Sequence, residues 1–150
     1  MMRGVGLSML AAGLAACAAM VPALSHDHAT GVVKERMDLM ESIGKRMKAI
    51  NARIKSRQEL AKVKDDARAM ATSAGHIAHL FPPGSTQHPT EAKTTIWQDF
   101  PDFERKAKAL EEESAKLAQA NANDFPALAA QVRAVSRTCG NCHETYRVRR

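Results

Sequence analysis

Apolar residues recur every three or four positions along four separate stretches of the chain, and charged residues fill the positions between them. In the first stretch, residues 30–55, successive apolar residues are four, three, three, four, three and four positions apart. This spacing puts them on one face of a helix, because an α-helix has 3.6 residues per turn. The stripe consists of Val33, Met37, Met40, Ile43, Met47, Ile50 and Ile54.

Three further stretches follow the same rule, separated by residues that begin or end helices. Ser56-Arg57-Gln58-Glu59 has the capping-box pattern of a second helix, which Pro82-Pro83-Gly84 ends. Asp99 and Asp124, each followed two residues later by a proline, begin a third and a fourth helix. The three stripes are Leu60, Val63, Ala67, Met70, Ala74, Ile77 and Phe81; Phe103, Ala107, Leu110, Ser114 and Leu117; and Leu128, Val132, Val135, Cys139, Cys142 and Tyr146.

Four amphipathic helices joined by one short, one long and one short connection predict an all-α fold, an antiparallel up-down four-helix bundle. The long connection, residues 82–98, contains Ile96 and Trp97, so we expect it to pack on the bundle. The stripes are rich in alanine and methionine. Small and flexible side chains of this kind leave room in the core for a group that is not protein.

The first 25 residues have the organisation of a secretory signal peptide. A basic start that ends at Arg3 precedes an uncharged apolar run, and Ala23-Leu24-Ser25 places small residues before a cleavage site. The predicted domains are therefore a signal peptide, 1–25, and a mature bundle, 26–150, exported to the periplasm. A second interpretation is a lipoprotein, because Leu14-Ala15-Ala16-Cys17 resembles a lipobox that would carry a lipid on Cys17.

Composition narrows the function classes. The chain has 150 residues with 22 basic and 16 acidic side chains, a formal charge of +6. Cleavage after Ser25 would remove one charge, that of Arg3. A mild basic bias spread along the chain does not predict a nucleic-acid interface, which needs a concentrated patch. Aromatic residues make up only 4%, which disfavours a β-sandwich. No apolar run of about 20 residues follows the first 25, so no membrane span is expected in the mature chain.

The chemistry-bearing motif is Cys139-Gly140-Asn141-Cys142-His143, close to the C-terminus. In this spacing two thiols add to the two vinyl groups of haem, and the adjacent histidine coordinates the iron; C-x-x-C-H is the attachment signature of c-type haem. Export would supply the compartment in which such haem is attached. The motif therefore predicts one covalently bound haem c as the cofactor.

Three rival interpretations of the cysteine pair stay open at this point. A thioredoxin-like redox motif would require a βαβ setting, and a disulfide across so short a helical loop would be strained. A zinc site would need further ligands, for which His76 and His79 are the candidates, giving a haem-free metal-binding helical protein.

Several motifs together resemble the class II cytochromes c, the cytochrome c′ and cytochrome c-556 family. They are Arg36-x-x-x-Met40, Phe81-Pro82-Pro83-Gly84-Ser85, Thr90-Glu91-Ala92-Lys93, Ile96-Trp97 and the terminal C-G-N-C-H-E-T-Y-R. They span almost all of the mature chain.

The resemblance implies a role for each matching residue. Cys139 and Cys142 would form the thioethers and His143 would be the proximal iron ligand. Arg36 would bind a haem propionate. The alternative is that Arg36 is an ordinary charged residue on the solvent-facing side of the helix. Trp97 would cover the haem edge or serve in plain core packing, and Arg147 would lie near the proximal face.

Met40 decides the mechanism that the resemblance implies. As the distal ligand of a cytochrome c-556-like protein it would give a six-coordinate iron suited to carrying single electrons, since thioether ligation raises the reduction potential. If the residue only crowds the distal face, the protein would be a five-coordinate cytochrome c′ that binds NO or CO. Met37 and Met47 could be mistaken for this ligand. The expected partners are redox proteins, and NO or CO in the alternative.

Other features are weaker signals. His26-Asp27-His28 would form a copper- or nickel-binding N-terminus after cleavage. The resemblance also implies a homodimer built on the first two helices, although Lys45, Lys48, Arg53 and Lys55 make this pair basic. No Ser/His/Asp constellation, phosphate loop or carboxylate pair suggests an enzyme.

Overall fold

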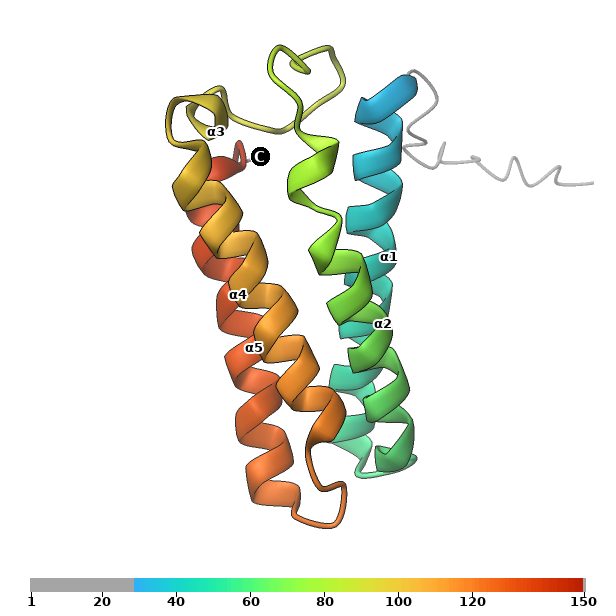
Figure 1. Ribbon diagram of the computed structural model, residues 1–150. Helices are drawn as coiled ribbons and strands as arrows, with labels where there is room; N and C mark the ends of the chain where they lie inside the picture. The colour runs from blue at the N-terminus through green and yellow to red at the C-terminus, as the bar shows by residue number, and fades with distance from the viewer. Residues whose placement is uncertain (1–28, 150) are drawn as a thin grey trace, which may run out of the picture.

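Four long helices run alternately up and down along the molecule (Figure 1). The computed structural model describes residues 29–149, and all the facts below concern this range. The helices are α1 (Gly31–Ser56), α2 (Val63–Gly75), α4 (Phe100–Gln119) and α5 (Phe125–Tyr146). Shorter helical turns are η1 (Leu60–Lys62), η2 (Ala78–Leu80) and α3 (Thr95–Gln98). The predicted all-α up-down bundle is confirmed.

The helices do not pack equally against one another. Helix α2 lies against α1 and α4, and α4 lies against α5, whereas α1 and α5 approach each other much less. The bundle is therefore closed on three sides and more open between α1 and α5. This opening becomes important because α5 carries the cysteine motif.

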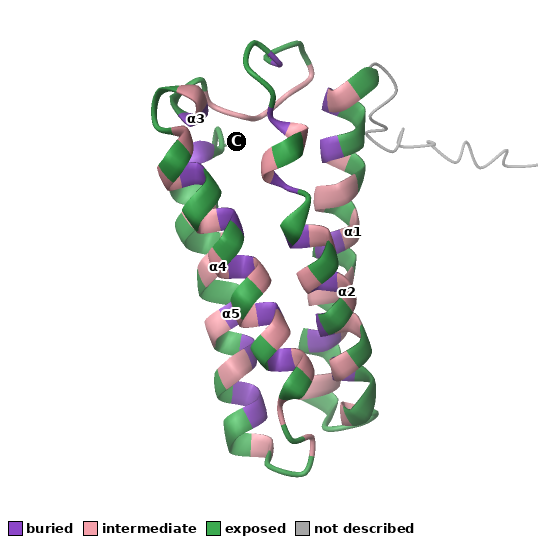
Figure 2. Cartoon of the chain, in the orientation of Figure 1, coloured by how far each residue is buried: buried purple, intermediate pink, exposed green. Residues whose placement is uncertain are grey.

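The apolar stripes predicted from the sequence form the core. Buried and exposed positions alternate along each long helix, as Figure 2 shows by colour, and the buried apolar residues of the four helices make up one core. Phe103 lies at the centre of an aromatic cluster, with ring centroids 4.7 Å from Phe81, 5.8 Å from Phe100 and 5.4 Å from Tyr146. Aromatic rings at such separations add to the stabilisation that burial provides.

The N-termini of α4 and α5 are capped as the sequence predicts. The Asp99 carboxylate accepts a hydrogen bond from the Asp102 backbone N–H, at 3.3 Å, and the Asp124 carboxylate accepts one from Ala127, at 3.1 Å. Each helix also has a proline in its first turn. The caps satisfy backbone donors that have no partner within the helix.

Replacing the cap of α5 is expected to weaken the fold measurably. Asp124→Ala removes the acceptor for the Ala127 N–H, and the free energy of unfolding should fall by about 1 kcal/mol. Chemical denaturation checks this, with Lys108→Ala, an exposed change in the middle of α4, as the control. Equal unfolding midpoints for the two variants would show that the cap contributes nothing.

The predicted start of the second helix is wrong. Ser56 is the last residue of α1, and its hydroxyl accepts a hydrogen bond from Gln58 N at 3.3 Å and caps no following helix. Arg57 and Glu59 have left-handed backbone angles, φ 55° and 52°, which make a tight turn between α1 and η1. The turn competes for the same hydroxyl, so the local capping pattern is not realised. The second helix is also interrupted after Gly75 and continues as η2.

The long connection packs on the bundle as expected. Ile96 is 1% exposed, and the Trp97 indole N–H lies 3.0 Å from both the Phe81 and the Pro82 carbonyl oxygens. The connection is also joined to the C-terminal end of α5: Lys93 N donates to Tyr146 O, and an isolated antiparallel bridge links Ala92 with Arg147. It therefore fixes the end of the helix that carries the cysteine motif.

Several sequence predictions fall on residues 1–28, outside the described residues. They are the signal peptide, the lipobox cysteine Cys17 and the histidine pair His26 and His28. Within residues 29–149, none of the helices combines the length and the apolar character that a membrane crossing requires.

Candidate functional site

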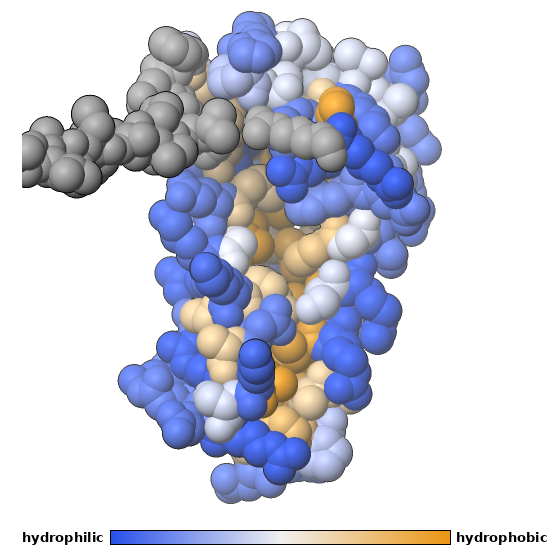
Figure 3. Space-filling model, turned by 180° about the vertical axis from the view of Figure 1, so that it is seen from behind, coloured by the Kyte–Doolittle hydropathy of each residue, from blue (hydrophilic) through white to orange (hydrophobic). Residues whose placement is uncertain are grey.

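A cavity of about 780 Å³ lies in the upper half of the bundle, where α1 and α5 diverge. Figure 3 views the molecule from the side opposite to Figure 1 and shows an apolar, hollowed strip between two hydrophilic margins. Side chains from α1, α4, α5 and the long connection form its walls. A volume of this size is typical of a site for a large organic ligand.

The cysteine motif lines this cavity. Cys139, Cys142 and His143 belong to the last two turns of α5, and all three contribute to the wall. Their spacing explains this, because residues three and four apart on a helix share a face. Both cysteines are free thiols. Burial raises the pKa of both, that of Cys142 to about 11, so the thiols are protonated at neutral pH.

The surroundings of the His143 imidazole favour its neutral form, although part of the residue is exposed to solvent. Burial against the cavity lowers its pKa, and the neighbouring positive charge of Arg147 lowers it further. A neutral imidazole keeps a nitrogen lone pair free, which is the form that binds a metal ion. His143 is thus electrostatically prepared to be a ligand.

Arg36 is a buried cation on the opposite wall, only 3% exposed, and not a solvated helix charge. Its Nη1 donates to Ser85 Oγ at 3.1 Å, and its Nη2 donates to Ser85 O and Thr90 Oγ1, both at 2.7 Å. The guanidinium also lies 4.8 Å from the centre of the Phe81 ring. These acceptors are uncharged, and burial lowers the pKa of Arg36. A buried cation of this kind is costly unless an anion joins it.

This arrangement fits the haem that the motif predicts. The cavity supplies apolar walls, two thiols and a neutral imidazole on one side, and on the other a guanidinium that a propionate carboxylate would neutralise. The chemistry of the donor set therefore matches both the reactive and the charged groups of the cofactor.

Three methionines of α1 line the cavity: Met37, Met40 and Met47. Met40 and Met47 also pack against the buried core. Met40 lies one turn from Arg36, about 6 Å along the helix axis, whereas Met47 lies about 16 Å from it.

The remaining predicted residues differ in position. Arg147 lines the cavity, and its guanidinium forms an ion pair with Glu91 at 2.6 Å. Trp97 is not among the lining residues; its neighbour Ile96 is. The indole hydrogen bonds to the carbonyls after η2 give Trp97 a role in holding the connection to the bundle. Covering of a haem edge by Trp97 stays a prediction.

Sequence reasoning missed four polar residues of the site. Ser85 and Thr90 hold Arg36, Glu91 holds Arg147, and Lys106 of α4 lines the cavity near Cys142. The first three were part of quoted motifs but had no assigned partner. Their partners lie about 50 residues away along the chain, and no local pattern indicates such pairs.

The rival zinc site is not formed by the described residues, because no three His, Cys, Asp or Glu side chains in residues 29–149 converge as a metal site. His76 and His79 are both exposed and do not line the cavity of the cysteines. Cys139 and Cys142 are free thiols, so the disulfide is not formed either.

Tyr146, the single tyrosine of the chain, forms a hydrogen bond that links α5 to α4. Its hydroxyl lies 2.7 Å from the Asp102 carboxylate, and burial together with this carboxylate raises the pKa of Tyr146 to about 12. The same hydrogen bond is the main cause of a lowered Asp102 pKa. The hydrogen bond therefore stabilises both the protonated phenol of Tyr146 and the ionised carboxylate of Asp102.

Alkaline titration should show one phenol that ionises near pH 12, about two units above the ordinary value. The raised pKa contributes stability that is fully present below about pH 10 and is lost as the pH rises through about 12. Near-ultraviolet phenolate absorbance measures the midpoint, and Asp102→Asn, which removes the negative charge, should lower it. A wild-type midpoint near the ordinary value would contradict the prediction.

Comparison with known proteins agrees with the site. Residues 31–147 match the family described as Cytochrome C′. The chain is 31% identical over 122 residues to cytochrome c-556 of Agrobacterium tumefaciens (strain II Chrys), covering 80% of this chain and 99% of that protein. It is also 31% identical over 144 residues to cytochrome c′ of Rhodospirillum rubrum, covering 93% and 96%.

A solved structure is similar over the same range. A triple mutant of Rhodopseudomonas palustris cytochrome c′ superposes with a TM-score of 0.74 at 26% identity, covering 81% of this chain and all of that one. The four-helix fold, the haem-attachment motif and the matched range all agree. The chain therefore belongs to the cytochrome c′ family, which includes the c-556 proteins and whose members bind one covalent haem c.

Proposed function

We propose that this protein is a periplasmic monohaem cytochrome of the c-556 type, which carries single electrons through a His/Met-ligated iron. The observation that carries the proposal is that Met40 and His143, from opposite walls, line the same cavity as the two cysteines. When bound, the haem supplies one reversible electron through its iron. The proposal is of a carrier and not of an enzyme.

The residues of the chain have distinct tasks in this proposal. Cys139 and Cys142 attach the cofactor through thioethers, which fixes its position even when the iron changes oxidation state. His143, kept neutral by burial and by Arg147, supplies the proximal nitrogen ligand. Arg36, held rigidly by Ser85 and Thr90, binds a propionate. These tasks require no movement of the helices, as rapid electron transfer demands.

Met40 supplies the distal thioether in this proposal. A methionine ligand raises the reduction potential of a His-ligated haem. Its nearness to Arg36 along α1 supports this assignment over Met47, and its packing on the core supports it over Met37.

A second candidate is a five-coordinate cytochrome c′ that binds NO or CO at the distal face. The equal identity to a c-556 and to a c′ protein supports keeping it. A structural relative, a variant of Alcaligenes xylosoxidans cytochrome c′ at 24% identity, is a nitric oxide complex. In that case Met40 would crowd the iron without binding it.

The optical spectrum of the purified holoprotein tests the proposal. A pyridine haemochrome spectrum reports whether haem c is attached. We expect a long-wavelength sulfur-to-iron absorption band in the oxidised protein and no spectral change when CO is added to the reduced protein. Rapid CO binding without a sulfur band would overturn the electron-carrier proposal and support the gas-binding candidate. A polypeptide without haem would overturn both.

Cleavage after Ser25 and export to the periplasm are part of the proposal. Intact mass of the secreted protein measures both the new N-terminus and the added cofactor. An N-terminal lipid on Cys17 would instead support the lipoprotein interpretation.

A further inference from the structure

The positive charge of the described chain is concentrated on the two helices that flank the cavity mouth. Helix α1 carries seven basic and three acidic side chains, and one of the seven, Arg36, is buried in the cavity wall. Residues 125–149, which contain α5, carry four basic and one acidic. Helix α2 is balanced, and α4 has five acidic side chains against four basic.

Basic residues also border the mouth itself. Lys48 is exposed and lines the cavity, and Lys55, also exposed, lies seven residues later on the same face of α1. On the other side of the mouth, the exposed Arg147 lines the cavity from the end of α5 and forms an ion pair with Glu91. Lys106 of α4 lines the cavity as well, and Glu41 and Glu91 are the acidic residues of the lining. The strip between these margins is apolar (Figure 3).

We propose that this face, the cavity mouth bordered by Lys48 and Arg147 together with Lys55 further along the same face of α1, docks an electron-transfer protein with an acidic surface. An apolar centre within a charged rim is the usual anatomy of a transient protein interface. Complementary charges on such a rim steer the partner and raise the rate of association. The proposal rests on the proposed function, since it assumes that electrons leave through the mouth of the haem cavity.

Charge complementarity selects an acidic protein over the other occupants of this face. A second copy of the chain would bring two basic surfaces together, which is repulsive. The opposite face, formed by α2 and α4, has no such excess of positive charge. It therefore serves as an internal control on the same molecule.

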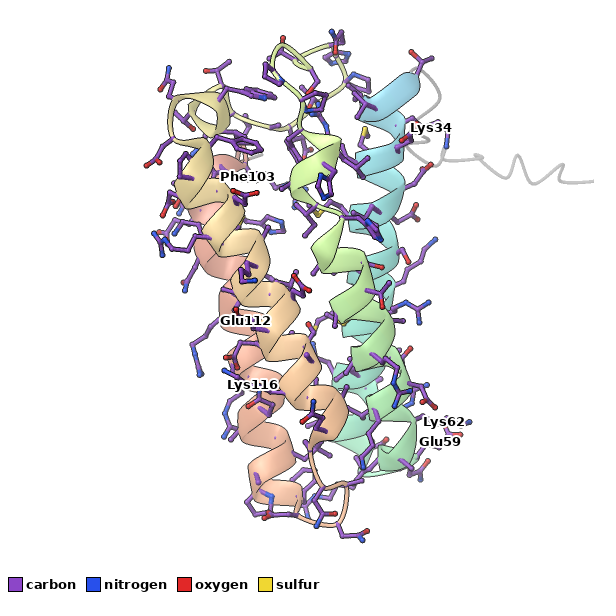
Figure 4. The ribbon with its side chains drawn as sticks, in the orientation of Figure 1. Lys34, Glu59, Lys62, Phe103, Glu112 and Lys116 are labelled. Carbon is purple, nitrogen blue, oxygen red and sulfur yellow. The ribbon has the colours of Figure 1, made fainter. Side chains whose placement is uncertain are left out.

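Two matched double variants test the proposal. Lys48→Gln with Lys55→Gln removes two positive charges beside the mouth. Lys108→Gln with Lys116→Gln removes two from exposed positions of α4, on the opposite side; Lys116 is labelled in Figure 4. Both variants have the same net charge, so any difference between them reports where the charge lies.

Stopped-flow oxidation of the reduced holoprotein by hexacyanoferrate(III) is the first measurement. One electron passes from the protein to this trivalent anion. At about 10 mM ionic strength the mouth variant should react at least about threefold more slowly than wild type. The α4 variant should change the rate by much less. The cationic oxidant tris(phenanthroline)cobalt(III) should react faster with the mouth variant than with wild type.

Reduction of the oxidised holoprotein by the hydroquinone of an acidic flavodoxin extends the test to a protein of partner size. The rate should fall with added salt and fall further in the mouth variant. Equal rates for the two variants would overturn the proposal, as would binding of this face to anionic vesicles without any effect on electron transfer. Dimerisation through the face in sedimentation experiments would overturn it too. If no haem is attached, the proposed function fails instead, which the haemochrome spectrum reveals separately.

Discussion

Replacing Cys139 and Cys142 by alanine should abolish covalent haem attachment altogether. Both thiols line the cavity, and each would form one thioether. No competing metal site is formed within residues 29–149. The intact mass of the secreted variant should be that of the bare polypeptide. Extraction with acidified organic solvent should remove any haem from this variant and leave a colourless protein. Each single variant should retain one thioether and give a shifted haemochrome band.

The matched control is Thr138→Ala. Thr138 also lines the cavity from α5, next to Cys139, and its hydroxyl donates to Val135 O at 2.7 Å within the helix. This variant removes a polar side chain at the same wall, beside Cys139, and leaves both thiols in place, so it should keep its covalent haem. Haem that remained covalently bound to the double cysteine variant would disprove the attachment site.

The thiols are expected to react slowly in the folded, haem-free chain. Burial raises the pKa of both, and only the thiolate is a good nucleophile. Attachment should therefore be faster while α5 is still unfolded. This gives a reason why addition of haem to refolded apoprotein would be inefficient even though the cavity fits it.

Met40→Ala should convert the protein from an electron carrier whose iron does not bind CO into a protein that binds CO. Loss of the thioether should abolish the sulfur-to-iron band, lower the reduction potential and leave an open coordination position. The fold should survive, because Met40 is only half-buried and the loss of its packing should cost about 2 kcal/mol. Optical spectra with and without CO, together with a potentiometric titration, measure these changes.

Met47→Ala is the control for Met40→Ala, since both methionines line the cavity and pack on the core. Met47→Ala should lose similar packing but keep the sulfur band and stay closed to CO. If Met47→Ala lost the sulfur band and bound CO while Met40→Ala did not, Met47 would be the ligand. A sulfur band that persists in both variants would make Met37 the ligand. A wild type without the band would favour the gas-binding candidate.

Local sequence signals predicted the parts of the fold that depend on residues within one helical turn. The stripes identified the buried faces of all four long helices, and Asp99 and Asp124 cap α4 and α5 as expected. The failure at Ser56 is also instructive. Its capping pattern was present, but Arg57 and Glu59 adopt left-handed angles in the α1–η1 turn, and the hydroxyl serves that turn.

The residues of the candidate site also fall into two groups, those that local spacing predicts and those that only the fold brings together. Cys139, Cys142 and His143 are contiguous and helical, so their common face followed from spacing alone. Arg36 required the fold: its partners Ser85 and Thr90 are 49 and 54 positions away, and only their contact buries the guanidinium. Covering of the haem edge by Trp97 stays a prediction; the fold shows that its indole N–H donates to the carbonyls of Phe81 and Pro82.

The sequence by itself determined the helices, their buried faces and the attachment motif, because each depends on side chains three or four positions apart. Only the tertiary structure decided that α1 and α5 diverge, which creates the cavity, and that their basic residues gather around its mouth. Burial and electrostatic fields depend on distances in space between segments remote in the chain, and the order of residues does not contain those distances explicitly.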